Sequence, residues 1–157
     1  MTPLTAGIAA MYQDALLAHH RAPHNRRRID APSASAARKN PVCGDEITVM
    51  IVCDTDVVRD VAFTGRGCSI ATASASMMTD AVRGIAVSDA LGLADAVDRM
   101  LHQAGGRGAA SSTGVEAAPE RLPDVLSPLL GVAPFPGRHG CAMLPWQALR
   151  EAVAGTR

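Results

Sequence analysis

The sequence predicts an α/β (α+β) domain, because a β-hairpin pattern is flanked on both sides by helical patterns. Apolar residues alternate along 47–52, and a second β-branched run covers 57–63 after the Asp-Thr-Asp turn. The flanking segments repeat apolar residues at three- and four-residue steps, which is typical of amphipathic helices. A chain of 157 residues fits one domain, so we treat 1–157 as a single unit.

The first helix is expected over 5–19, and Pro23 ends it. Its apolar stripe consists of Ile8, Met11, Tyr12, Ala15 and Leu16. Residues 24–41 are rich in Arg, Ala, Ser and Pro, which indicates a surface connection. One short strand is compatible with this connection, but its position does not follow from the pattern.

Four further segments follow the hairpin. A closely packed helix is expected over 69–82, because Gly-Arg-Gly breaks the strand and Ala, Ser and Met follow. The next helix is expected over 88–102 with Ser88 as N-cap and, on its buried side, Leu91, Ala94, Val97 and Leu101. Residues 104–120 lack apolar periodicity and predict a mobile loop. A short helix near 122–130 precedes a last helix that starts near Cys141 and carries Leu144, Ala148, Leu149 and Val153.

Charge and hydropathy exclude two classes of protein. Fifteen basic residues balance fifteen acidic ones at a pI near 7.0, whereas a dedicated nucleic-acid binder would carry a basic excess. No apolar run approaches the roughly 20 residues that cross a bilayer, and the N-terminus lacks the pattern of a signal peptide. We therefore expect a soluble, cytoplasmic protein that binds neither nucleic acid nor membrane. In that compartment, four cysteines favour metal binding or catalysis over disulfides.

Three of the cysteines lie where a turn meets a regular element. Cys43 follows a Pro turn, Cys68 lies between a strand and a helix, and Cys141 lies at the start of the last helix. With Asp45, two residues after Cys43, they could complete a tetrahedral zinc site. The chain has no CxxC pair, so spacing alone leaves open that these cysteines are small buried hydrophobes. For Cys53, at the apolar end of a strand, we expect that hydrophobic role.

Four stretches of the chain carry a resemblance to a known family. NPVCGDEI (40–47) and FTGRGCSIATASASMMTDAVRG (63–84) resemble the SufU-type sulfurtransferases, a branch of the IscU/NifU-like iron-sulfur assembly proteins. MYQDALLAHHRAPHN (11–25) is similar to the family's first helix. The extra segment before the last cysteine and LLGVAPFPGRHGCAMLPWQAL (129–149) are similar to the SufU branch in particular.

The resemblance implies an IscU/SufU-like architecture, in which helices cover one side of a small antiparallel sheet and a metal site lies at one exposed end. It also implies that Cys43, Asp45, Cys68 and Cys141 bind zinc. The implied function is a zinc-dependent sulfurtransferase. It would accept persulfide sulfur on Cys43 from a SufS-type pyridoxal-phosphate cysteine desulfurase and supply downstream iron-sulfur assembly proteins.

Several further residues have two interpretations. Arg138 matches the family's Arg before the last cysteine and could orient the site or the partner, and His19 could support the site or simply be structural. His139 is either a metal ligand or a solvated loop residue. The run 26–28 of three arginines is interpreted as a solvated surface with a docking patch as the alternative, and Met77-Met78 as core. Gly140 departs from the family, which has Lys or His at that position.

Two other functions use the same residues. The first is a scaffold on which an iron-sulfur cluster assembles, since thiolates bind both zinc and such clusters. The second is a structural zinc module that only binds a partner. The sequence leaves open whether the protein is itself an enzyme, its oligomeric state and the next sulfur acceptor.

Overall fold

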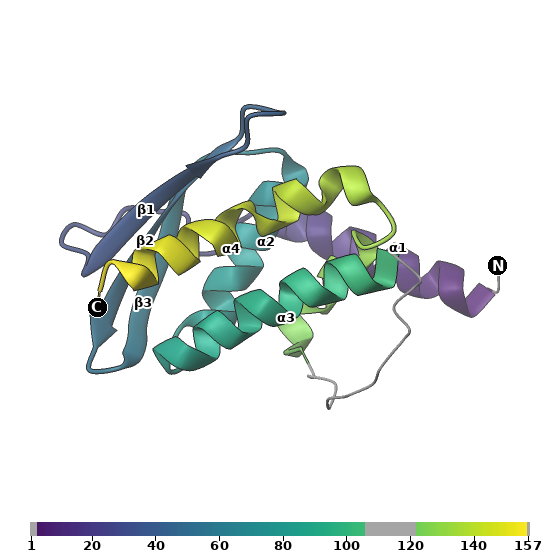
Figure 1. The fold of residues 1–157 in the computed structure, drawn as a ribbon. Coiled ribbons are helices and arrows are strands. Elements are labelled where there is room, and N and C mark those ends of the chain that lie inside the picture. The colour runs from purple at the N-terminus through teal and green to yellow at the C-terminus, as the bar shows by residue number, and fades with distance from the viewer. Residues whose placement is uncertain (1–2, 106–121, 157) are drawn as a thin grey trace.

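The computed structural model describes residues 3–105 and 122–156 (Figure 1). The chain begins with a helix, forms three strands and then continues through helices to its end. In chain order these elements are α1 (Pro3–Arg21), β1 (Ala34–Lys39), β2 (Glu46–Asp54), β3 (Val57–Arg66), α2 (Ser69–Val82), α3 (Val87–Gly105), the 3-10 helices η2 (Asp124–Gly131) and η3 (Pro136–Arg138), and α4 (His139–Ala154).

The three strands form one antiparallel sheet in the order β1-β2-β3. The predicted hairpin is confirmed, with Val49 opposite Phe63 and a register shift between Val52 and Cys53. The short strand left without a position within 24–41 is β1, which pairs antiparallel with β2. Ile47, Val49 and Ile51 are fully buried, so alternate residues of β2 face the helices.

The helices cover one face of the sheet, as the resemblance implied (Figure 1). α4 packs across β1 and β2, and α2 packs between α4 and α1. The largest fully buried side chains come from the sheet and from these helices, and they include Trp146, Phe63, Met77 and Met78. The interpretation of Met77-Met78 as core is therefore confirmed.

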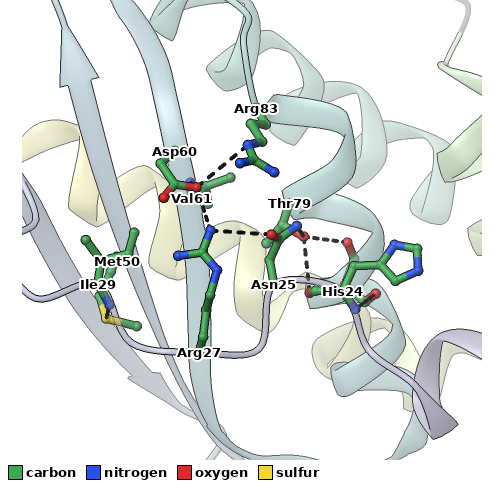
Figure 2. Close-up of polar contacts among 10 residues, drawn as sticks. His24, Asn25, Arg27, Ile29, Met50, Asp60, Val61, Thr79 and Arg83 are labelled. Carbon is green, nitrogen blue, oxygen red and sulfur yellow. Dashed lines mark hydrogen bonds and ion pairs between the residues drawn. The ribbon is translucent and has the colours of Figure 1, made fainter.

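The connection from α1 to β1 crosses α2 and β3 and is held by polar contacts (Figure 2). Arg27 Nη2 donates to Asp60 Oδ1 at 2.7 Å, and this hydrogen bond lowers the pKa of the Asp60 carboxyl, although partial burial opposes the shift. Arg26 Nη2 donates to the carbonyl of Gly65 at 2.8 Å. The arginine run is exposed, as predicted, but Arg26 and Arg27 also bind β3.

Several predicted boundaries and positions were wrong. α3 begins at Val87, so Ser88 lies inside its first turn and is not the N-cap. α4 begins at His139, two residues before the predicted start, whereas the short helix predicted near 122–130 is confirmed as the 3-10 helix η2. Met11 is 67% exposed, so it lies outside the face of α1 that packs on the core through Leu16. Of the predicted loop, 104 and 105 belong to α3, and 106–120 lie outside the described residues.

Gly65 lies in close contact with the backbone at the start of β2, and its substitution tests whether the fold needs this close approach. Its φ is +122°, and an added Cβ would lie 2.2 Å from the carbonyl oxygen of Glu46. We expect Gly65→Ala to lower the free energy of unfolding by about 3 kcal/mol, because overpacking and backbone strain each cost about 1–3 kcal/mol.

The measurement is thermal unfolding, with Gly92→Ala as the matched control. Gly92 lies inside α3 with open space around its Cα, so alanine there should stabilise the helix by about 0.5–1 kcal/mol. Equal melting temperatures for the two variants would contradict this role of Gly65.

Candidate metal centre

Sulfur and carboxylate donors from three segments converge at one end of the sheet. Cys43 and Asp45 come from the turn before β2, Cys68 from the junction of β3 and α2, and Cys141 from the first turn of α4. The sulfurs of Cys43 and Cys141 and a carboxylate oxygen of Asp45 all lie within 4.8 Å of one another. The thiol of Cys141 also interacts with that of Cys68. The structure thus brings together all four residues that the resemblance implied.

The turn that carries Cys43 is organised by Asn40. Asn40 donates its backbone N–H to the Asp45 carbonyl at 2.8 Å, and its own carbonyl accepts from the Gly44 N–H at 2.7 Å. Its side-chain oxygen accepts from the Val42 N–H at 3.0 Å. Gly44 has φ +79° with no atom within 4 Å of an added Cβ, so this tip has free space around it. Cys43 is exposed as a result.

Asp45 and Cys68 are joined directly. The Cys68 N–H donates to Asp45 Oδ2 at 3.0 Å, which orients the carboxylate toward the start of α2. Cys68 is the N-cap of that helix, and its sulfur accepts from the Ala71 N–H at 3.5 Å. Cys68 therefore both ends the β3–α2 junction and satisfies a free N–H of the first turn of α2.

Cys141 is the buried member of the group, with 7% of its surface exposed. Burial, followed by the neighbouring thiols of Cys68 and Cys43, raises the pKa of the Cys141 thiol to about 12. Without a cation this sulfur therefore stays protonated at neutral pH. A bound divalent cation would favour the thiolate, since metal binding displaces protons from cysteine.

The donor set fits zinc. Three thiols and one carboxylate match the sulfur and oxygen ligands of tetrahedral zinc sites. Thiolates also hold iron-sulfur clusters, so the donor types alone admit both kinds of centre.

A buried hydrogen-bond chain joins α4 to α2, and no sequence pattern signals it. Ser74 Oγ donates to the Ala142 carbonyl at 2.7 Å, and Trp146 Nε1 donates to Ser74 Oγ at 3.1 Å. Ala142 follows Cys141 directly, and Ser74 lies on the helix capped by Cys68. The chain therefore joins the two helices that carry these cysteines. A serine inside an Ala- and Ser-rich helix looks like small-residue packing, so only the structure identifies its role.

The histidines proposed for the site are engaged elsewhere. His19 lies on α1, and its Nδ1 is 2.7 Å from Ser76 Oγ on α2, away from the four donors. Burial first, then the nearby His24, lowers the pKa of His19, and Asp80 partly opposes this. His139 is only 8% exposed, so its interpretation as a solvated loop residue was wrong. Its Nε2 lies 2.9 Å from the Ala133 carbonyl, which occupies that ring nitrogen.

The remaining predicted residues lie at the margin of the centre. Arg138 is the exposed N-cap residue of α4. A side chain at Gly140 would begin 3.4 Å from Asn40 Nδ2, so the residue before Cys141 faces the turn of Cys43. Cys53 is far along β2, half-buried against the core, and burial raises the pKa of its thiol. Its expected role as a small hydrophobe agrees with this partial packing.

Within the described residues, no helix combines the length and the apolar character needed to span a membrane. This agrees with the absence of a bilayer-length apolar run in the sequence.

Comparison with known proteins places the chain and its fold in a family. The family model "NifU-like N terminal domain" matches residues 11–155. An iron-sulfur cluster assembly scaffold protein IscU from Streptococcus pyogenes is 38% identical, covering 91% of this chain and 82% of that protein. The zinc-dependent sulfurtransferase SufU from Bacillus subtilis is 34% identical, covering 95% of this chain and 93% of that protein.

Solved structures agree with these matches. The putative SufU scaffold protein from Fervidobacterium islandicum has a TM-score of 0.71 at 26% identity, covering 88% of this chain and 93% of that one. A NifU-like N-terminal protein from Brucella abortus shares the fold with a TM-score of 0.78 at 23% identity, covering 95% and 96% of the two chains. The sequence match along nearly the whole chain, together with this shared fold, establishes that the protein belongs to the NifU-like N-terminal domain family.

Proposed function

We propose that this protein is a zinc-dependent sulfur acceptor that takes persulfide sulfur from a SufS-type pyridoxal-phosphate cysteine desulfurase and passes it on for iron-sulfur cluster assembly. The observation that carries the proposal is the convergence of three thiols and one carboxylate at one end of the sheet. The Bacillus subtilis relative, described as a zinc-dependent sulfurtransferase, supports zinc and sulfur transfer.

The proposed zinc ligands are Cys43, Asp45, Cys68 and Cys141. When bound, zinc would keep these thiols deprotonated at neutral pH, where a free thiol with a pKa of about 8.5 is mostly protonated. The chain's own contribution is to hold three of the donors in place. The Asp45 carboxylate accepts the Cys68 N–H, and Cys141 is buried in α4.

Cys43 is the proposed sulfur acceptor because it is the exposed cysteine of the group and lies in the turn between β1 and β2. Its thiolate would attack the outer sulfur of the desulfurase persulfide. A new S–S bond then forms on Cys43 while the donor S–S bond breaks, and the desulfurase cysteine leaves as a thiolate. Gly44 supports this role, since its left-handed backbone and open surroundings let the tip of the turn move.

Two further residues receive supporting roles in the proposal. Arg138 is exposed and three residues before Cys141, so we assign it a contact with an acidic group on the desulfurase. His19 contacts Ser76 on α2, the helix that Cys68 caps, so it would act by holding that helix rather than by touching sulfur.

A second candidate function is an iron-sulfur cluster scaffold that uses the same four residues. The Streptococcus pyogenes relative, described as a scaffold, favours it. Purified protein that is colourless and contains zinc would favour sulfur transfer, whereas brown protein with visible absorbance would favour the scaffold. A protein that acts only as a structural zinc module would leave desulfurase turnover unchanged.

We expect one zinc ion per chain, and its removal should lower the melting temperature because the ligand turns lose their common tie. Free zinc at about 1,000 times its Kd adds about 4 kcal/mol to the free energy of unfolding. This corresponds to a rise in melting temperature of roughly 8–16 °C in a domain of this size. Metal analysis and thermal unfolding with and without a strong chelator measure both quantities.

The matched control is Cys53→Ser, which removes a thiol outside the centre. It should retain zinc and show the same shift on chelation. An unchanged melting temperature after confirmed removal of the metal would count against the proposed ligand set.

Cys43→Ser and Cys141→Ser should fail in different ways. Cys43→Ser should retain zinc with weaker affinity, because three ligands stay fixed, yet accept no sulfur and fail to stimulate the desulfurase. Cys141→Ser should chiefly lose zinc. The assay is mass spectrometry of each variant after incubation with desulfurase and cysteine, with alanine release measured in parallel and Cys53→Ser as the control. Persulfide on Cys68 or Cys53 of the wild-type protein, or normal loading of Cys43→Ser, would reject Cys43 as the acceptor.

A further inference from the structure

A second group of metal-binding side chains lies where the end of α1 and the following loop pack against α2. One ring nitrogen each from His19 and His24 and a carboxylate oxygen of Asp80 all lie within 4.8 Å of one another. His24 Nδ1 is 2.6 Å from Asp80 Oδ2, and the two imidazole centroids are 4.8 Å apart. The three residues come from a helix, a loop and a second helix, so the fold brings them together.

Partly buried contacts hold the backbone of His24 in position. The His24 N–H donates to Ser76 Oγ at 2.8 Å, and the same hydroxyl lies 2.7 Å from His19 Nδ1. Asn25 Nδ2 donates to Thr79 Oγ1 at 3.0 Å, and the Thr79 hydroxyl lies 3.4 Å from the His24 carbonyl. Figure 2 shows the His24 imidazole extending away from its contacts with Thr79. The backbone of His24 is therefore anchored on α2, while its ring extends to Asp80 and His19.

The group is accessible and separate from the cysteine centre. The side chains of His24 and Asp80 are 55% and 30% exposed, so an ion can reach them from solvent. Cys68 caps the N-terminus of α2, whereas Asp80 lies near its other end. Twelve residues separate the two along the helix (80 − 68), which is about 18 Å at a rise of about 1.5 Å per residue.

We propose that His19, His24 and Asp80 form a second metal site, for a divalent first-row transition ion such as Zn²⁺ or Fe²⁺. Two imidazoles and one carboxylate are a donor set used for both ions, and three protein ligands leave positions open for water or another ligand. The ion would replace the hydrogen bond between His24 Nδ1 and Asp80 Oδ2. Their N···O separation would widen to about 3.0–3.4 Å, as two ligands about 2.1 Å from one octahedral or tetrahedral ion require, and both side chains are exposed enough to adjust.

The test is titration of the untagged, zinc-loaded full-length protein with Co²⁺, followed by visible spectroscopy and calorimetry. We expect an additional equivalent of Co²⁺ with the weak d–d absorption of nitrogen and oxygen ligation. Cobalt that entered the cysteine centre instead would show the intense sulfur-to-metal charge-transfer bands. A failure of the cysteine centre is therefore distinguished from a failure of this site.

Two variants and one control locate the ion. His24→Ala and Asp80→Asn should each weaken Co²⁺ binding at least about tenfold, since each removes a ligand. His20→Ala removes the neighbouring exposed imidazole of α1 and should leave the affinity unchanged. Near-UV circular dichroism of the variants checks that they remain folded. Absence of the additional equivalent, or equal affinity in wild type, His24→Ala and Asp80→Asn, would overturn the proposal.

The imidazole signals in the NMR spectrum give an independent readout. Paramagnetic Co²⁺ should broaden the signals of His19 and His24 more than that of His102, which lies on α3 against His139. Broadening confined to other histidines would also overturn the proposal.

Discussion

The packing of α2 against α4 is the interaction on which the cysteine centre depends. Cys68 caps the first of these helices, and Cys141 lies in the first turn of the second. Ser74 joins them, because its hydroxyl donates to the Ala142 carbonyl and accepts from the Trp146 indole inside the core. If the Ala142 carbonyl or the Trp146 indole N–H lost its hydrogen bond to Ser74, the free energy of unfolding would fall by about 1–3 kcal/mol. The hydrogen-bond chain therefore favours one arrangement of the two helices. The sheet then needs only to deliver Asp45 and Cys43 beside them.

Burial divides the four donors into fixed and exposed members. The Asp45 carboxylate accepts a hydrogen bond from the Cys68 N–H, and Cys141 is a buried residue of α4. Cys43, by contrast, lies in an exposed turn beside Gly44. A centre for sulfur transfer needs this division, since a fully enclosed nucleophile cannot reach a partner's persulfide. The exposed Cys43 is thus the donor proposed to exchange sulfur, and Asp45, Cys68 and Cys141 are proposed to keep the metal.

The sequence predicted those elements whose side chains carry a strong period. The β2–β3 hairpin and α2 were located closely, because apolar alternation and a Gly-Arg-Gly break are local signals. β1 could not be placed, since Ala34–Lys39 has no large apolar residue and is held at the sheet edge by pairing with β2. The start of α4 was missed because η3 leads into it with no side-chain cap.

Local sequence patterns also failed to predict most of the candidate sites. Spacing alone left the role of the cysteines open, and the family resemblance supplied the ligand set. The burial of His139 and the group of His19, His24 and Asp80 both depend on tertiary contacts between segments far apart in the chain. Such contacts leave no periodic signal. α2 thus contributes a ligand to each of the two proposed metal sites, Cys68 at its N-terminal end and Asp80 near its C-terminal end.

X-ray absorption at the zinc edge of the purified full-length protein tests the central claim most directly. The account predicts three sulfur atoms at about 2.3 Å and one oxygen at about 2.0–2.2 Å around a four-coordinate zinc. Cys53→Ser should give the same spectrum. A first shell made only of nitrogen and oxygen, or metal present as iron with short Fe–Fe scattering in place of zinc, would contradict it.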